Sequence, residues 1–303
     1  MKKPTTNVSA SILARLKNIS EKENLDFNFL LLRYIQERFL ARLAASKYVK
    51  KFVLKGGFLL LAYNIEKARP TKDIDFLGVN VSSERKELEK IIRAIASINV
   101  DDGIEFLSDS IKSEEIKEEA EYSGIRIKLT AKVGTARNTI QIDFGFGDIA
   151  IPQPRLMDYP TLLNNKSAKV LAYSKETIVA EKFEAIVKLT TFNSRMKDFF
   201  DIVFLANEFE FNGSILQSAI SNTFKQRKTD LNSAMEMLDS DFGDQPNFKT
   251  SWEAFKKRIK QKSEESFKNV FAEIRQFLEM IVKAELENKT VDKTWNRITR
   301  KWE

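Results

Sequence analysis

The sequence predicts an α+β fold, in which helices precede a small mixed sheet and an all-helical C-terminal half follows it. Two helical stretches open the chain, and short strand-like segments then occupy residues 50–146. From residue 175 onward, apolar residues recur at three- and four-residue steps, which is the spacing of one helix face. Prolines punctuate the connection between the halves. We therefore expect an N-terminal α/β domain over residues 1–165 and a C-terminal helical domain over residues 166–303.

The spacing of apolar residues predicts the helices and strands of the first half. Ile12, Leu16 and Ile19 recur at helical spacing, and the segment IRIKLTAKV at 125–133 alternates apolar and polar residues as a half-exposed strand does. The predicted helices are 8–22, 27–47, 57–64 and 83–97, and the predicted strands are 50–54, 73–77, 103–107, 125–133 and 138–144.

The second half reads as helices throughout. The segments with helical spacing are 175–190, 194–208, 212–224, 247–262 and 265–287.

The chain contains neither His nor Cys. Their absence excludes Ser-His-Asp and Cys-His hydrolases, disulfides, and zinc sites built from Cys and His. Acid–base or metal chemistry here must therefore use carboxylates, lysines, hydroxyls and water.

Charge is unevenly distributed along the chain. The net charge is +7, with 14 basic and 5 acidic residues in 1–70 but 19 and 24 in 71–224. A basic surface beside an acidic site would suit a polyanionic partner, although a lysine-rich solubilising surface would give the same pattern. Six basic residues of the N-terminal part are candidates for guiding such a partner: Arg33, Arg38, Arg42, Lys47, Lys50 and Lys51. The start of the chain lacks an apolar signal segment, so we expect a cytoplasmic protein without a membrane contact.

The most distinctive local feature is Lys55-Gly56-Gly57 followed by Asp73-Ile-Asp75-Phe. Residues two apart on a strand point to the same face, so Asp73 and Asp75 are expected side by side. Paired carboxylates repel unless a cation lies between them, and hard oxygen ligands suit Mg²⁺ or Mn²⁺. Glycines at a strand-to-helix junction let backbone N–H groups approach a phosphate. This combination is typical of metal-assisted phosphoryl or nucleotidyl transfer.

A third carboxylate lies in the predicted strand Ile140-Gln-Ile-Asp143-Phe. Alternation places Asp143 opposite the apolar face, where it could be a further metal ligand. It could equally be a strand-end aspartate that faces water.

The helical half contributes Lys182 and the segment Arg195-Met-Lys-Asp198-Phe-Phe-Asp201. Lys182 is a candidate phosphate contact. Asp198 and Asp201 share a helix face, and intrahelical pairs of Arg195 with Asp198 and of Lys197 with Asp201 are the alternative interpretation.

Taken together, these motifs resemble the AbiEii/AbiGii-type nucleotidyltransferase toxins, a branch of the polymerase-beta-like nucleotidyltransferase superfamily. The resemblance covers roughly residues 25–230. The matching segments are YIQERFLARLAASKYVKKFVLKGGFLLLAY, RPTKDIDFLG, IQIDFGFGD, ETIVAEKFEAIVKL, NSRMKDFFDI and TFKQRKT. Many superfamily members have the sequence Gly-Ser at this point, and the serine hydroxyl contacts phosphate. In this chain, Phe58 follows Gly57.

The resemblance implies roles for individual residues. Asp73, Asp75 and Asp143 would hold Mg²⁺ or Mn²⁺, and Lys182 and Asp198 would act with them in catalysis. The NTP would be bound by Lys55, Gly56, Gly57, Thr71, Lys72, Arg195 and Asp201. The implied reaction transfers a nucleoside monophosphate from an NTP to an RNA, with the 3′ end of tRNA as the expected acceptor. The implied biology is a toxin of a phage-defence system, whose antitoxin is a winged-helix repressor encoded nearby; whether that repressor contacts the toxin is open.

Two alternatives remain at this stage. One is a non-catalytic NTP- or RNA-binding module of the same fold, although both Asp73 and Asp75 are present. The other is a nucleotidyltransferase that acts on a protein or a small molecule.

Overall fold

The computed structural model describes residues 7–64, 67–117, 123–189, 195–239, 241–260 and 264–303. Its backbone forms two compact units, and neither is continuous in sequence. The first unit comprises residues 1–62, 71–147 and 155–172, and the second comprises 63–70, 148–154 and 173–303. No helix of the described residues is both long and apolar enough to cross a bilayer.

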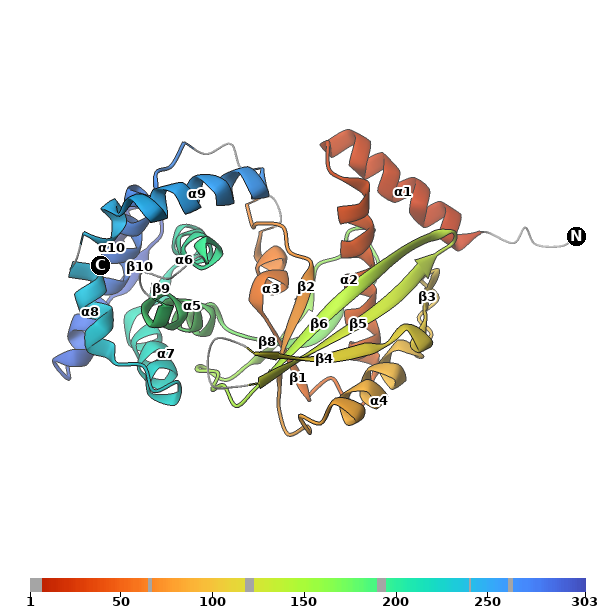
Figure 1. Ribbon diagram of the computed structural model, residues 1–303, viewed down its shortest axis with the longest axis horizontal. Helices are drawn as coiled ribbons and strands as arrows, with labels where there is room; N and C mark the ends of the chain where they lie inside the picture. The colour runs from red at the N-terminus through yellow and green to blue at the C-terminus, as the bar shows by residue number, and fades with distance from the viewer. Residues whose placement is uncertain (1–6, 65–66, 118–122, 190–194, 240, 261–263) are drawn as a thin grey trace, which may run out of the picture. The chain divides into compact units, whose positions relative to one another are not determined.

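A mixed sheet forms the centre of the first unit (Figure 1). Its strands lie in the order β3-β5-β6-β2-β1-β8-β7, and β4 pairs with β5. The β2–β6 and β1–β8 pairs are parallel, and the remaining pairs are antiparallel. The strands are β1 (Phe52–Lys55), β2 (Asp73–Gly78), β3 (Ile104–Phe106), β4 (Lys112–Lys117), β5 (Ser123–Val133), β6 (Ala136–Phe146), β7 (Arg155–Tyr159) and β8 (Ala168–Ala172).

Four helices belong to this sheet: α1 (Val8–Glu23), α2 (Phe27–Ala45), α3 (Gly56–Tyr63) and α4 (Arg85–Ala96). Asp26 starts α2, because its side chain accepts a hydrogen bond from the Phe29 N–H at 2.8 Å. Helix α2 then packs against β6 and β8, while α1 and α4 pack on α2. This layer covers the apolar face of the sheet and leaves the other face for polar side chains.

The core of the first unit depends on the two-residue alternation of β2 and β6. Ile74 and Ile142 are fully buried, and Phe76 stacks on Phe144 with ring centroids 5.8 Å apart. Burying each such side chain contributes roughly 1.5–3 kcal/mol. These contacts fix the register of the two strands, and they therefore fix which residues lie on the opposite face.

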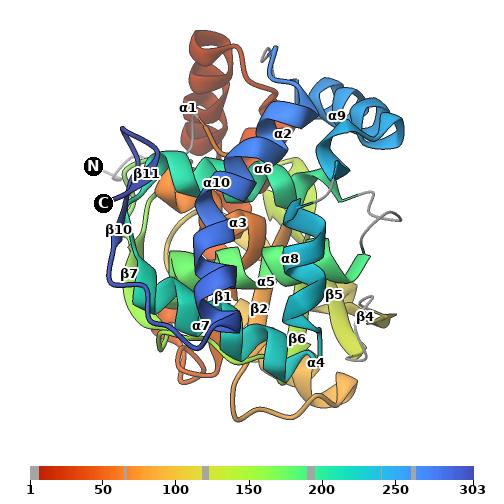
Figure 2. The ribbon, with the colours of Figure 1, turned by 90° about the vertical axis from the view of Figure 1, so that its left-hand side faces the viewer.

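The second unit contains six longer helices (Figure 2). They are α5 (Lys175–Leu189), α6 (Met196–Glu208), α7 (Gly213–Gln226), α8 (Leu231–Asp239), α9 (Pro246–Ile259) and α10 (Phe267–Leu286). An aromatic cluster joins three of these helices to the short turn at 242–244: Phe199 of α6 contacts the rings of Phe242, Phe248 and Phe267 at 5.0–6.5 Å between centroids.

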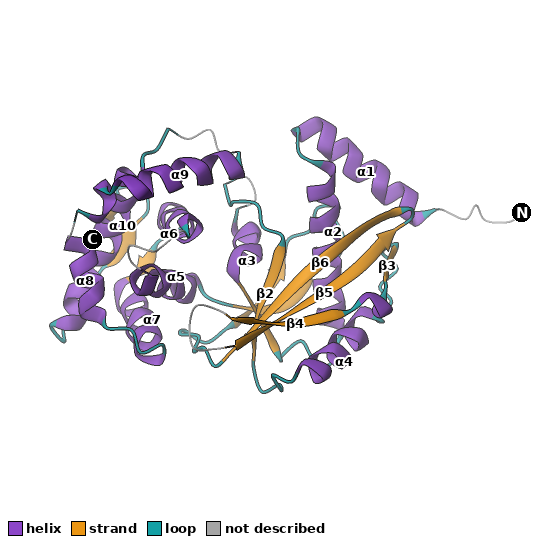
Figure 3. Cartoon of the chain, viewed as in Figure 1, coloured by secondary structure: helices purple, strands orange, loops and turns teal. Residues whose placement is uncertain are grey.

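The second unit also contains strands, so the prediction of an all-helical C-terminal half is only partly right. Strands β9 (Phe211–Asn212), β10 (Thr294–Asn296) and β11 (Lys301–Trp302) form a small antiparallel sheet (Figure 3). Trp295 holds it against α6 by donating from its indole nitrogen to the Ala206 carbonyl at 2.8 Å. These strands are two or three residues long, which leaves no periodic signal in the sequence, and β9 pairs with a strand far along the chain, with Phe211 opposite Trp295.

Most other predicted elements agree with the structure to within one to three residues at each end. The predicted start of the helix at 194–208 falls partly outside the described residues, and α6 begins at Met196. Strands β4, β7 and β8 and helix α8 were not predicted. Strands β7 and β8 lie in the proline-containing segment that was expected to connect the two halves of the chain.

Candidate active site

Strand β2 places Asp73 and Asp75 on the polar face of the first unit's sheet. Ile74, which lies between the two aspartates, and Phe76, which follows Asp75, are buried on the opposite face, with 0% and 1% of their surface exposed. Both aspartates are partly exposed. The predicted side-by-side arrangement of the two carboxylates therefore follows from the strand register.

Strand β6 adds a third carboxylate to this face. It runs parallel to β2, with Asp143 opposite Asp75 and Gln141 opposite Asp73. Residues paired on neighbouring strands project to the same side of a sheet. We call this polar surface, formed by Asp73, Asp75, Gln141 and Asp143, the carboxylate face.

Arg126 of β5 binds the third carboxylate directly. Its Nε and Nη2 atoms donate to the two oxygens of Asp143 at 2.9 and 2.8 Å, and Gln141 donates to one of the same oxygens at 3.3 Å. The hydrogen bonds with Asp143 raise the pKa of Arg126. Asp143 is therefore not a strand-end residue that faces water, and both of its carboxylate oxygens already bind Arg126. The alternation of residues 125–133 had already placed Arg126 on the polar face, but nothing in the sequence showed its partner.

Gly56 brings the backbone at the start of α3 against Asp75. It has a φ of +68°, and a Cβ at this position would lie 2.0 Å from Asp75 Oδ2. Only glycine can occupy this position without displacing the carboxylate. The predicted strand-to-helix junction at Gly56-Gly57 is confirmed, because β1 ends at Lys55 and α3 begins at Gly56.

The side chains of Lys55 and Phe58, on either side of this junction, are both buried. Lys55 pairs in register with Asp75, and its ammonium lies 3.5 Å from where a Cβ of Gly145 would be. Phe58, which replaces the superfamily serine, is fully buried and stacks on Tyr159. Phe58 therefore belongs to the core and offers no hydroxyl group at this turn.

Thr71 and Lys72 immediately precede β2. Thr71 is partly exposed and Lys72 is exposed. The Lys72 carbonyl accepts a hydrogen bond from the buried Gln36 of α2 at 2.9 Å. This bond ties the segment before Asp73 to the helical layer and so limits movement of the first metal-ligand candidate.

In the second unit, Lys182 binds two buried aspartates of α6. Its ammonium lies 2.8 Å from Asp198 Oδ1 and 2.7 Å from Asp201 Oδ2. The side chains of Asp198 and Asp201 are each 1% exposed. These aspartates are therefore buried and bind a lysine of another helix, whereas intrahelical pairs on an exposed helix face would have left them in contact with solvent.

Two arginines complete this group, which we call the lysine–aspartate cluster (Lys182, Asp198, Asp201, Arg69 and Arg195). Arg69 donates to both oxygens of Asp201 at 2.9 Å, and Arg195 donates to Asp198 at 2.8 Å. The predicted Arg195–Asp198 pair is therefore present, whereas Asp201 binds Lys182 and Arg69. Arg69 had been assigned no role from sequence.

The pKa values reflect this pairing. Burial alone raises the pKa of Asp198, but Lys182 and Arg195 outweigh it and lower that pKa to about 2. Burial lowers the pKa of Lys182, and the two aspartates outweigh it, so the net shift is upward. Both groups are therefore charged at neutral pH. Lys197, partly buried beside Arg195, has a lowered pKa, because burial and the neighbouring cations disfavour its charge.

A second ionic group of this unit surrounds Arg227. Its guanidinium donates to Asp148 at 3.0 Å and to Glu184 at 2.9 Å, and it lies 3.4 Å from Glu181. Burial lowers the pKa of Arg227, but the three carboxylates outweigh it and raise it. The motif containing Arg227 had been recognised in the sequence, but its partners had not.

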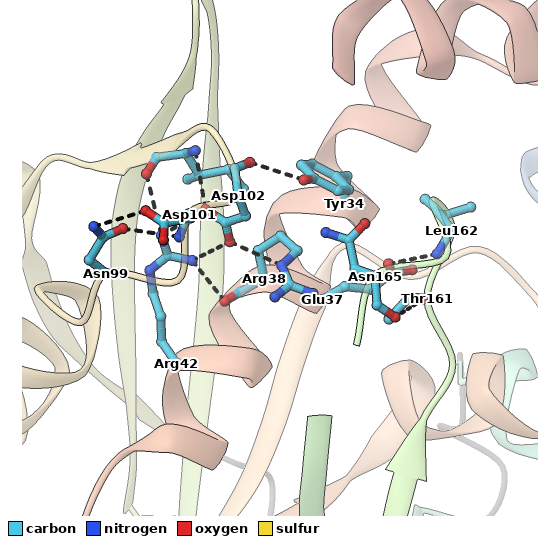
Figure 4. Close-up of polar contacts among 11 residues, drawn as sticks. Tyr34, Glu37, Arg38, Arg42, Asn99, Asp101, Asp102, Thr161, Leu162 and Asn165 are labelled. Atoms are coloured by element: carbon cyan, nitrogen blue, oxygen red, sulfur yellow. Dashed lines mark hydrogen bonds and ion pairs between the residues drawn. The ribbon is translucent and has the colours of Figure 1, made fainter. Parts of the chain in front are cut away.

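The arginines of α2 are not a surface for RNA, contrary to the prediction. Arg33, Arg38 and Arg42 are 2–5% exposed. Arg38 and Arg42 converge on Asp102, with Arg42 at 2.6 and 2.9 Å from its two oxygens (Figure 4). The helix is covered on several sides, so these three arginines lie inside the first unit and not on its surface. Lys47 and Lys50 are exposed and Lys51 is partly exposed.

The donor set of the carboxylate face fits one hard divalent cation. Mg²⁺ is commonly held by one or two carboxylates together with substrate phosphates. Asp73 and Asp75 offer such a pair. Among the described residues, no group of three or more carboxylates is arranged to hold a metal with protein ligands alone. A cation held by Asp73 and Asp75 would therefore need further ligands besides these two carboxylates.

The mixed sheet with paired aspartates beside a glycine-initiated helix defines the class of protein as nucleotidyltransferase-like. The chain belongs to the family of nucleotidyl transferase AbiEii toxins of type IV toxin–antitoxin systems, whose sequence model matches residues 38–279. A search of curated protein sequences finds no match.

Two solved structures from Helicobacter pylori resemble this chain. JHP933 is 16% identical, with a TM-score of 0.51 over 87% of this chain and 95% of its own. A protein described as a nucleotidyltransferase candidate is also 16% identical, with a TM-score of 0.49 over 87% and 98%. At this identity, the likeness to JHP933 establishes the fold alone.

Proposed function

We propose that this protein is a metal-dependent nucleotidyltransferase toxin that transfers a nucleoside monophosphate from an NTP to RNA, at the 3′ end of a tRNA. The observation that carries the proposal is the pair Asp73 and Asp75 on one face of β2, with the Asp75 carboxylate against Gly56 at the start of α3. Membership of a nucleotidyltransferase toxin family supports it.

Asp73 and Asp75 would hold Mg²⁺ or Mn²⁺. When bound, the ion would neutralise the triphosphate and polarise the phosphate under attack. The backbone N–H groups at Gly56 and Gly57 would bind phosphate oxygens, because the N-terminus of a helix favours anions. Lys55, Thr71 and Lys72 are the neighbouring side chains with the chemistry to assist.

The proposed reaction is a displacement at the α-phosphorus. The oxygen of the RNA hydroxyl forms a bond to the α-phosphorus, the bond from that phosphorus to the bridging oxygen breaks, and pyrophosphate leaves. The hydroxyl proton passes to solvent. Asp198, with a pKa of about 2 and two cationic partners, is a weak proton acceptor. We therefore assign it to orienting Lys182, and we assign Arg195 and Asp201 to nucleotide binding, which the family resemblance implies.

The test is a transfer assay with each of the four NTPs, labelled at the α-phosphate, and total RNA. We expect label in RNA of tRNA size that depends on Mg²⁺ or Mn²⁺. Asp73→Asn and Asp75→Asn should each lower the rate by at least about 100-fold, as removal of a charge-stabilising group does. The exposed Asp109 provides the control Asp109→Asn, which should leave the rate unchanged.

The outcomes separate the alternatives. Label in protein or in a small molecule would replace RNA as the acceptor. Metal-dependent NTP binding with no transfer to any acceptor would indicate a non-catalytic module. Full activity of Asp73→Asn and Asp75→Asn would overturn the site.

We propose that this activity halts growth as a phage defence, and that a winged-helix repressor encoded nearby is the antitoxin. Induction should arrest growth in the wild type but not in Asp75→Asn. Co-expression of the neighbouring repressor should restore growth, and its co-purification with the toxin would decide whether the two proteins bind directly.

A further inference from the structure

The carboxylate face belongs to a row of charged side chains that crosses five strands. Strand pairing aligns Glu114 of β4 with Arg126 of β5, Arg126 with Asp143 of β6, Asp143 with Asp75 of β2, and Asp75 with Lys55 of β1. Because residues paired across strands share a face, all five lie on the polar side of the sheet. A positive side chain thus lies on each side of the two aligned aspartates.

Within this row, Arg126 and Asp143 form a direct ion pair. The guanidinium uses two parallel N–H groups and engages both carboxylate oxygens, at 2.9 and 2.8 Å. Bidentate arginine–carboxylate pairs are among the strongest and most directional hydrogen-bonded pairs in proteins. The Asp143 side chain is 11% exposed, so solvent screens the pair only weakly. A divalent cation at Asp143 would have to displace the arginine or lie beside it at a repulsive distance.

The charge balance of the face points the same way. The ion pair between Glu114 and Lys128 is neutral as a whole. Of the remaining side chains, Asp73, Asp75 and Asp143 carry three negative charges, and Arg126 and Lys55 carry two positive ones. One divalent cation changes this group from one net negative charge to one net positive charge, which suits a nucleotide. A second cation would leave three positive charges on one small surface.

We propose that Arg126 takes the place of a second metal ion, so that the site works with one divalent cation held by Asp73 and Asp75. Asp143 is then a positioning residue that holds Arg126, and it is not a metal ligand. The side chain of Arg126 is 29% exposed, which leaves part of the guanidinium accessible to a phosphate. This inference rests on the proposed function, because it concerns the same metal centre.

The test counts bound ions. Mn²⁺ is titrated into the full-length protein with a nucleotide whose α,β-bridging oxygen is replaced by a methylene group, and free Mn²⁺ is followed by electron paramagnetic resonance. We expect one Mn²⁺ in the wild type and one in Asp143→Asn, with affinities within about threefold of each other. Arg126→Gln frees Asp143 and should bind two. Lys128→Gln is the matched control, since Lys128 lies two residues along the same strand and face and pairs with Glu114; it should bind one.

Two results would overturn the inference while leaving the proposed function in place. One is two ions in the wild type with one lost in Asp143→Asn, and the other is a single ion in folded Arg126→Gln. No Mn²⁺ binding to the wild type with nucleotide would instead contradict the metal centre of the proposed function. If Arg126→Gln does not fold, Arg126→Met provides the measurement: it keeps a long side chain but removes the charge, so Asp143 should gain a second ion in that variant, and its absence would overturn the inference.

Discussion

The Asp75 carboxylate lies so close to Gly56 that a methyl group on the glycine would be 2.0 Å from its Oδ2 atom. This approach joins the first turn of α3 to the metal-ligand candidate of β2. The consequence is that the backbone at Gly56 and the side chain of Asp75 cannot be changed independently.

Gly56→Ala should therefore affect both stability and activity. A positive φ costs roughly 1–2 kcal/mol for a residue with a Cβ, and overpacking adds roughly 1–3 kcal/mol. Displacement of Asp75 should lower the transfer rate by about 100-fold. Urea unfolding and the transfer assay measure the two effects.

Gly134→Ala is the matched control for that variant. Gly134 has a φ of +59°, but a Cβ there would meet its nearest atom at an ordinary 3.4 Å. Only the backbone cost of roughly 1–2 kcal/mol is expected, with the transfer rate intact. Equal losses of activity in the two variants would contradict the role of the Gly56–Asp75 contact.

Replacing Lys182 by Met should destabilise the second unit strongly. Lys182 is the cation shared by Asp198 and Asp201, and removing one partner of a buried ion pair costs roughly 3–5 kcal/mol. Chemical unfolding checks this value. Lys169→Met removes an exposed lysine at 3.4 Å from Asp158 and should cost at most about 1 kcal/mol. Similar losses of unfolding free energy in the two variants would show that the ion pairs of Lys182 contribute no more than an exposed pair does.

Glu37 should make stability fall as the pH rises from about 5 to 8. Burial raises the pKa of Glu37 from 4.5 to about 7, although Arg33 and the Leu162 N–H oppose the shift. The folded protein thus holds this proton more tightly than the unfolded chain does. The stabilisation is fully present below about pH 4.5 and is lost as the pH rises through about 7.

The size of that loss is on the order of 3 kcal/mol, since one pKa unit corresponds to about 1.4 kcal/mol. Denaturant unfolding at pH 5 and pH 8 measures it. Glu37→Gln keeps an oxygen for the Leu162 N–H, whose bond to Glu37 is 2.9 Å, and should remove most of the dependence. An unchanged slope in Glu37→Gln would assign the effect to other groups.

Lys47 and Lys50, the exposed lysines that follow α2, should contribute to RNA affinity. Replacing both by Gln should reduce the slope of log affinity against log salt by roughly 1.4, because each phosphate contact to a single strand contributes about 0.7. Filter binding of tRNA across a salt series is the measurement. Arg42→Gln serves as the contrast: it should destabilise the fold through Asp102 and leave the salt slope of the remaining folded protein unchanged.

The sequence predicted the elements that have strong local periodicity. The alternation around Asp73 and Asp75 requires only that one face of β2 be apolar, and the Gly-Gly pair marked the start of α3. Short pairings had no such signal, as β9 and β10 show. The polar residues of α2 were misassigned for a related reason: a helical pattern does not show how many sides of the helix are covered.

The sequence by itself indicated the class of chemistry, through the paired aspartates Asp73 and Asp75 downstream of Gly56-Gly57 and through the resemblance of its motifs to a nucleotidyltransferase toxin family. Tertiary structure decided which charges meet. Arg126 and Asp143 are 17 residues apart and meet through the register of a hairpin, while Arg69 and Asp201 are 132 apart. The physical reason is that alternation fixes the direction of a side chain locally, whereas its partner depends on the strands and helices that pack beside it.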